Sequence, residues 1–150
     1  MANQPPPAPE QAPQFEECNS NALRRAARAV GQLYDQHLAQ SGLGGGQYGI
    51  LMALSARGPL SMTTLARHVG QDRTTLSRVL QPLLRDGPVQ SSTSAADRRS
   101  RQLELSAAGR QRLAQARPHW EAAQAAFEVN YGVERAATLR AMLQSLPSVR

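Results

Sequence analysis

Residues 61–85, "SMTTLARHVGQDRTTLSRVLQPLLR", constrain the fold more than any other stretch of the chain. Apolar residues recur every three or four positions on both sides of Gly70, which predicts two amphipathic helices joined by a tight turn. Ser61 and Asp72 can cap these helices. Gly70 can adopt the left-handed conformation of the turn, and the small Ala66 fits where the two backbones approach. Together these features predict a helix-turn-helix unit.

The second of these helices has two contrasting faces. Packing against the first helix turns its apolar side chains inward, namely Leu76, Val79, Leu80 and Leu83. The polar side chains left facing outward are Arg73, Thr74, Thr75, Ser77, Arg78 and Gln81. An ordinary solvated helix face is the alternative, but such a face usually mixes in acids, and this one has none after its cap. Arginines and hydroxyls can contact bases and phosphates, so we expect this face to enter the major groove of DNA.

Two extended segments follow, at residues 89–93 and 101–105, around the polar loop "SAADRRS". Leu103 and Leu105 alternate with polar neighbours, which predicts a strand with one buried face. An arginine at the tip of such a hairpin can enter the minor groove, where the negative potential is deepest. The residues expected at this DNA-contacting wing are Arg98, Arg99 and Arg101, together with Asp97, which we expect to hold an arginine in shape.

Long apolar stripes flank this unit on both sides. A helix is expected from about Asn19, and another is expected after Ser106, its predicted cap. The second stripe steps by three and four residues, as in a two-helix seam. Residues 1–16 are proline-rich and are predicted to form a disordered tail, because they cannot bury enough apolar surface to order themselves. Short strands among many helices predict a mainly α (α+β) domain.

Charge and composition limit the classes of partner. All 17 cations are arginines; between residues 57 and 117 eleven arginines face four acids, which gives +7, whereas the rest has six arginines and seven acids, which gives −1. A localised basic region favours a polyanionic partner, although a generic solvated surface is the alternative. We expect no membrane span and no secretory signal, and a single cysteine is consistent with the cytoplasm.

Taken together, these segments resemble the MarR family of bacterial transcriptional regulators over about residues 18–146. The matching pieces are "QYGILMAL", "LSMTTLARHVGQDRTTLSRVLQPLLRDG" and "DRRSRQLELSAAG", in which the acid, any residue, arginine pattern falls on Asp97 and Arg99. The resemblance implies a winged helix-turn-helix with N- and C-terminal helices that form a dimerisation domain. The implied boundaries are a single MarR-like domain at 17–150, with a winged helix at 47–106 and dimerisation helices at 18–40 and 107–147.

The resemblance also implies a function. Such proteins are obligate homodimers whose two winged helices read an inverted repeat in double-stranded DNA. Many are repressors that are released by a small phenolic or lipophilic ligand, by oxidation, or rarely by a metal.

Three local features depart from a regular version of this fold. Pro82 removes a helical hydrogen bond, so we expect a local bend in an otherwise intact helix. Pro88 stands where an apolar residue usually begins the first wing strand, and we expect a shortened strand. "GLGGGQY" replaces the usual threonine-capped start of the second helix, so that helix is expected to start raggedly.

The resemblance places an effector pocket between the dimerisation helices and the winged helix. The residues expected to line it are Leu33, His37, Tyr48, Leu51 and Trp120, with plain core packing as the alternative for each. Cys18 offers another switch, because the peroxide-sensing branch of the family uses an N-terminal cysteine that is hydrogen-bonded to tyrosines. Tyr34 matches one of those tyrosines, but the second would fall on Gly45. An incidental cysteine is the alternative.

Other classes of function find little support in the sequence. The three histidines lack metal-ligand spacing, so neither a metal nor another cofactor is expected. There is no phosphate-binding glycine loop after a strand and no nucleophile–base pair, so we do not expect an enzyme. A protein-binding winged helix would present apolar side chains on its outward face, which is polar here. The sequence therefore predicts a DNA-binding regulator.

Overall fold

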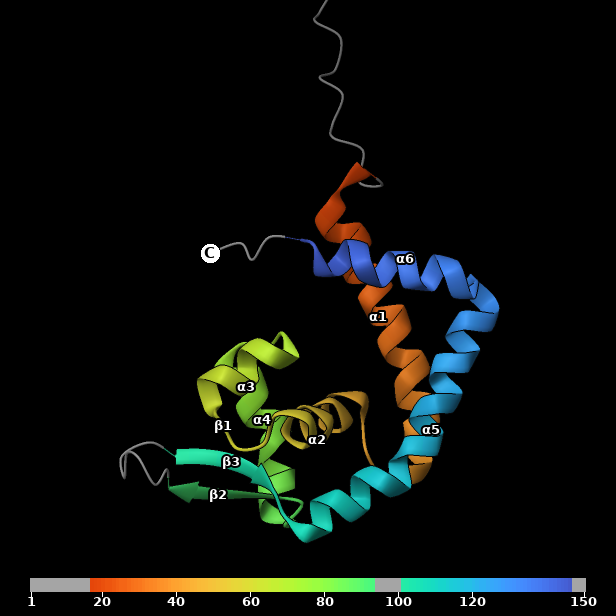
Figure 1. Ribbon diagram of the computed structural model, residues 1–150. Coiled ribbons are helices and arrows are strands. Elements are labelled where there is room, and N and C mark those ends of the chain that lie inside the picture. Colours follow the sequence, from red (N-terminus) through yellow and green to blue (C-terminus); the bar gives the residue numbers. More distant parts are fainter. Residues whose placement is uncertain (1–16, 94–100, 147–150) are drawn as a thin grey trace, which may run out of the picture.

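The computed structural model describes residues 17–93 and 101–146. It is a mainly helical domain with one small sheet (Figure 1). Its elements are α1 (Asn19–Leu38), η2 (Ala39–Ser41), α2 (Gly45–Arg57), β1 (Leu60–Ser61), α3 (Met62–Val69), α4 (Arg73–Arg85), β2 (Val89–Thr93), β3 (Arg101–Leu105), α5 (Ala107–Tyr131) and α6 (Val133–Gln144). The predicted tail at residues 1–16 and the tip of the wing at 94–100 lie outside the described residues.

The sheet is antiparallel with the strand order β1-β3-β2. The predicted hairpin is confirmed, because β2 and β3 pair along their whole length from Val89 opposite Leu105 to Thr93 opposite Arg101. The short strand β1 was not predicted. It pairs Leu60 with Leu103, about forty residues away, and a pairing of this kind leaves no local periodicity in two residues.

The core lies where α2, α3, α4 and the sheet meet. The predicted inward side chains of α4 are confirmed: Leu76, Leu80 and Leu83 are fully buried, and Val79 is half-buried against the same cluster. Full burial of a leucine contributes roughly 1.5–3 kcal/mol relative to exposure. This packing fixes which face of α4 points outward.

Two of the three expected irregularities are wrong. The strand β2 is not shortened by Pro88, because the strand begins at Val89 and a proline just before it needs no N–H for the ladder. The start of α2 is not ragged, because the Asp35 carboxylate accepts a hydrogen bond from the N–H of Gly45 at 2.7 Å. Gln47, within the glycine-rich segment, also accepts from the N–H of Gly44 at 3.2 Å, so a carboxylate of α1 and a local side chain cap α2 together. The helix α4 runs through Pro82 to Arg85, as expected.

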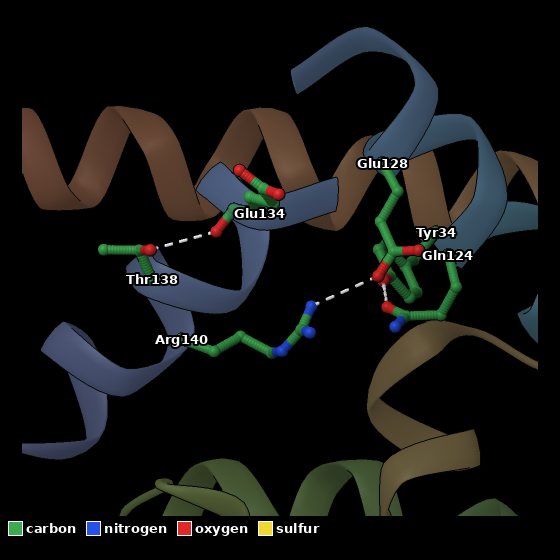
Figure 2. Close-up of polar contacts among 6 residues, drawn as sticks. All are labelled: Tyr34, Gln124, Glu128, Glu134, Thr138 and Arg140. Atoms are coloured by element: carbon green, nitrogen blue, oxygen red, sulfur yellow. Dashed lines mark hydrogen bonds and ion pairs between the residues drawn. The ribbon is translucent and has the colours of Figure 1, made fainter. Parts of the chain in front are cut away.

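The remaining helices form a frame beside the winged helix. The helix α5 packs along α1, and α6 turns back at Gly132 across α1 in the view of Figure 1. Figure 2 shows two polar contacts in this frame: the Tyr34 hydroxyl donates to Gln124, and Arg140 pairs with Glu128 at 3.3 Å. Burial, followed by the nearby Glu128 carboxylate, raises the pKa of Tyr34. The phenol therefore stays a neutral donor that links α1 to α5.

Within residues 17–93 and 101–146, no helix has both the length and the apolar character that a membrane span requires.

Candidate nucleic-acid interface

The start of α4 is fixed by one carboxylate. One oxygen of Asp72 accepts from the N–H of Thr75 at 2.9 Å, and the other accepts from the Thr75 hydroxyl at 2.6 Å. The hydroxyl bond is the largest of the effects that lower the pKa of Asp72. The predicted cap is confirmed, and the geometry adds that the hydroxyl of Thr75 is already used within the helix. Thr75 therefore holds the helix start in shape.

The turn before α4 has the predicted geometry. Gly70 ends α3 with a φ of +66°, a conformation that residues with a side chain rarely adopt. The N–H of Gln71 then donates back to the carbonyl of Ala66 at 3.0 Å. These bonds stop α3 and direct the chain into α4 within three residues.

The other predicted outward residues gather at one surface groove. This groove has a volume of about 470 Å³, and its lining is polar apart from one methionine. The lining residues are Met62, Arg73, Thr74, Ser77, Arg78 and Gln81. The structure thus brings five of the six predicted side chains together and adds Met62, from the start of α3. No sequence pattern indicated Met62, because its place depends on how α3 packs against α4.

The charges along α4 leave two cations available to a ligand. Arg85 forms an ion pair with Asp86 at 2.8 Å, at the far end of the helix. Arg73 and Arg78 are exposed and form no ion pair with any residue in 17–93 or 101–146. The helix itself contains no acid between residues 73 and 85. The groove is therefore electropositive, with its cations one and a half turns apart.

The wing continues this surface only in part. Arg101 begins β3 and is exposed. It lies opposite Thr93, at the end of the hairpin that adjoins residues 94–100. The predicted wing residues Asp97, Arg98 and Arg99 lie outside the described residues. Arg101 is therefore the wing cation whose position the structure describes.

The predicted effector residues separate into two groups. Tyr48 and Trp120 stack with ring centroids 6.0 Å apart and line a groove of about 240 Å³ between α2 and α5. Leu51 lies in the core with no exposed surface, and Leu33 and His37 are half-buried on α1 and do not line this groove. Of the five, Tyr48 and Trp120 share this groove, and a pocket common to all five stays a prediction.

A second groove, of about 480 Å³, runs along the other side of α2. It shares Met52 and Ala56 with the groove at Tyr48 and extends to His68 and Gln71 at the end of α3. The Oε1 atom of Gln71 is buried there without a hydrogen-bond partner among the described residues. Sequence reasoning missed these residues, because the groove lies beside glycines of α2, which have no side chains to fill it.

Cys18 does not meet its predicted tyrosine within the chain. It is exposed at the N-terminal end of α1, and Tyr34 lies sixteen residues further along the same helix, roughly 24 Å away at 1.5 Å per residue. The hydroxyl of Tyr34 is bonded to Gln124 instead. Within residues 17–93 and 101–146 there is also no group of three or more side chains that could hold a metal ion.

Comparisons with known proteins agree with this geometry. A family model described as "MarR family" matches residues 41–100. The crystal structure of the transcriptional regulator MosR of M. tuberculosis is 36% identical, covers 88% of this chain and 99% of its own, and superposes with a TM-score of 0.72. The chain belongs to the MarR family of transcriptional regulators.

Two further structures of MarR-family regulators show related chains on DNA. MosR in complex with DNA is 37% identical, covers 87% of this MarR-family chain and 100% of its own, and has a TM-score of 0.69. The transcriptional repressor CouR, bound to a 23-mer DNA duplex, is 27% identical over 87% of this chain and 92% of its own, with a TM-score of 0.77. None of the curated proteins matches the chain.

Proposed function

We propose that this MarR-family protein is a homodimeric, sequence-specific regulator that binds an inverted repeat in double-stranded DNA. In this proposal α4 enters the major groove and the wing enters the adjacent minor groove. The observation that carries it is the acid-free groove on α4. Its polar side chains point outward, while Leu76, Leu80 and Leu83 on the opposite face of the helix are buried in the core. A face of this kind can donate to base edges without any cost to the core.

Individual residues of α4 take different roles in the proposal. Arg78 lies about one and a half turns into the helix, where a guanidinium can fork onto guanine. Arg73 and Thr74 lie at the positive end of the helix, which favours phosphate. Thr75 keeps the helix start in shape through Asp72. Asp97, Arg98 and Arg99 remain proposed wing contacts together with Arg101. The similarity to MosR and CouR, whose structures contain DNA, supports DNA as the partner of these residues.

The proposal of a homodimer rests on the surface of the helical frame. Eight large apolar side chains are exposed among the described residues, and six of them lie on α1, the end of α5, or α6 and its end. These six are Leu23, Val129, Val133, Met142, Leu143 and Leu146. A monomer rarely exposes so many on one part of its surface. A second copy would cover them and place two α4 helices for two half-sites roughly 34 Å apart. In this proposal the winged helix at 47–106 binds DNA, and the helices at 18–40 and 107–147 form the dimer.

We further propose that the protein is a repressor that a small aromatic or lipophilic effector releases from DNA. The groove lined by Tyr48 and Trp120 is the proposed effector site, and it shares Met52 and Ala56 with the larger groove. Apolar walls with a few polar groups are typical of small-molecule sites. Release by oxidation of Cys18 stays the alternative, and it would require a partner group from the second subunit.

A selection experiment tests the DNA-binding function. Duplexes selected from a random pool by the wild-type protein should contain an inverted repeat. A Arg73→Ala/Arg78→Ala variant should bind them at least about tenfold more weakly, since a base-contacting arginine is worth roughly 1–3 kcal/mol. The matched control is Arg57→Ala, which removes an exposed arginine outside the α4 groove. Equal affinities for all three proteins would contradict the proposal.

A ligand screen tests the effector site separately. A molecule that binds in the groove lined by Tyr48 and Trp120 should raise the melting temperature and weaken binding to the selected duplex. Trp120→Ala should abolish the thermal shift but leave DNA binding without ligand unchanged. A ligand whose effect survives this substitution binds elsewhere.

A further inference from the structure

The base of the wing is bonded to the first turn of α5. The hydroxyl of Ser106 donates to the carbonyl of Gly87 at 2.6 Å, and the N–H of Ser106 donates to the carbonyl of Pro88 at 3.1 Å. The same hydroxyl oxygen accepts from the N–H of Gly109 at 3.0 Å, which caps α5. One side chain therefore joins the segment that enters β2 to the helix that follows β3.

The contact at Gly109 is even closer. A Cβ atom at this position would lie 2.0 Å from the carbonyl oxygen of Pro88 and 3.0 Å from Cδ2 of Leu105. The first of these neighbours is backbone, so a side chain cannot be accommodated by a change of rotamer. Glycine inside a helix is normally destabilising relative to alanine. The close approach of α5 to the wing accounts for glycine here.

The second strand of the wing is held from the same helix turn. The guanidinium of Arg110 donates to the carbonyl of Leu105 at 3.1 Å. Leu105 ends β3 and lies opposite Val89, the first residue of β2. Both strands of the hairpin are therefore attached at their base to residues 106–110, and we refer to this attachment as the wing joint.

We infer that the wing joint sets the position of the wing relative to α4, and that Ser106 and Gly109 are positioning residues for DNA binding. This inference rests on the proposed DNA-binding function. A five-residue strand is about 17 Å long, so a tilt of roughly 10° at the base moves the other end of the hairpin, at Thr93 and Arg101, by about 3 Å. Such a displacement is as long as a hydrogen bond, and it takes Arg101 and the rest of the wing away from their DNA contacts.

Three variants of the full chain separate this role from general stability. Gly109→Ala forces α5 away from Pro88. Ser106→Asp keeps the helix cap, because a carboxylate accepts from the N–H of Gly109, but it cannot donate to Gly87. Ser106→Thr keeps both functions of the hydroxyl. The matched control is Gly31→Ala, a helical glycine of α1 at which a Cβ would meet nothing within 4 Å.

Binding to the selected duplex is the first measurement. Gly109→Ala and Ser106→Asp should each weaken binding about tenfold, to the level of Arg101→Ala, whereas Ser106→Thr and Gly31→Ala should bind as the wild type does. Combined with Arg101→Ala, the joint variants should add little, because both changes remove the same wing contact; combined with Arg78→Ala, their effects should multiply. Full multiplication with Arg101→Ala would overturn the inference.

The second measurement needs no DNA. Spin labels at Thr93→Cys in the wing and Gln81→Cys in α4, in a Cys18→Ser background, report the distance between the two reading elements. This distance should shift or broaden in Ser106→Asp and stay unchanged in Ser106→Thr, which decides the matter even if Gly109→Ala does not fold. Unchanged distances in both overturn the inference. Failure of the wild type to select any duplex would contradict the proposed function, while the distances still test the joint.

Discussion

The helices α4 and α6 differ in how far their large apolar side chains are buried. In α4 the leucines that face the core are 0–1% exposed, and the opposite face is polar. In α6 only Ala136 is buried, whereas Met142 is 64% exposed and Leu143 is 44% exposed. The packing of α4 is thus complete within one chain, and its free surface suits a polar ligand. The packing of α6 is incomplete, so its free surface suits another protein surface.

The comparison extends to charge. Around the groove of α4 the cations Arg73 and Arg78 have no acidic partner among the described residues, whereas in the frame Arg140 is paired with Glu128. A pair within the frame adds to the shape of one subunit, although an exposed pair is worth only about 0–1 kcal/mol. An unpaired cation keeps its full attraction for a phosphate. The two regions therefore differ in both the polarity and the charge that they leave for a partner.

The largest effect should come from the underside of α4. Leu80→Ala removes a side chain that is 1% exposed and should lower the free energy of unfolding by about 2–5 kcal/mol, because it leaves a cavity. Leu84→Ala, in the same helix but 38% exposed, should cost about 1 kcal/mol or less. Urea unfolding measures both. Equal losses would mean that α4 is not packed on one side only.

The exposed face of α6 should give the next largest effect. Met142→Glu/Leu143→Glu places two charges where the partner is proposed to pack, and it should convert the dimer to monomer in sedimentation experiments. DNA binding should then weaken about 100-fold, because the two readers are no longer linked. The control is Leu84→Glu, which adds a charge at an exposed leucine outside α6. A dimer that survives both changes would break the comparison.

The two groove arginines of α4, Arg73 and Arg78, should contribute to DNA binding in different ways. Arg73→Ala should lower the salt dependence of DNA binding by about one unit in the log–log slope, because it removes a phosphate contact. Arg78→Ala should cost roughly 1–3 kcal/mol on the selected sequence and relax the base preference at one position. Neither should change the melting temperature, since both side chains are exposed. A uniform loss over all sequences for Arg78→Ala would reassign that residue to the backbone.

The smallest effect should come from the cap of α4. The Thr75 hydroxyl lowers the pKa of Asp72 in the folded protein below its ordinary value of 3.8. The stabilisation is therefore present above that pH and is lost as the pH falls through the folded-state pKa. Asp72→Asn keeps a cap that does not titrate, so its free energy of unfolding should depend less on pH as the pH falls below that ordinary value. If the free energy of unfolding depends on pH in the same way in both proteins, the hydrogen bond from Thr75 does not lower the pKa of Asp72.

Local features of this chain were predictable where neighbours in sequence decide them. The helix caps are side chains that accept from an N–H three residues further along the chain, at Ser61, Asp72 and Ser106. Gly70 adopts the left-handed conformation that the turn requires, because it has no side chain. The inward and outward faces of α4 followed from helical periodicity alone. The same reasoning failed in part at the start of α2, where Asp35 of another helix caps the helix together with the local Gln47.

The sequence alone determined the helix-turn-helix unit, the pairing of β2 with β3 and the polarity of the α4 face, because these depend on short-range spacing and on burial of one helix side. Only the tertiary structure decided which residues share a groove. It brought Tyr48 to Trp120 but left Leu33 and His37 outside, and it pressed Gly109 against Pro88. Such contacts join positions that lie 21 to 72 residues apart, and their geometry depends on how whole helices pack, which no local pattern records.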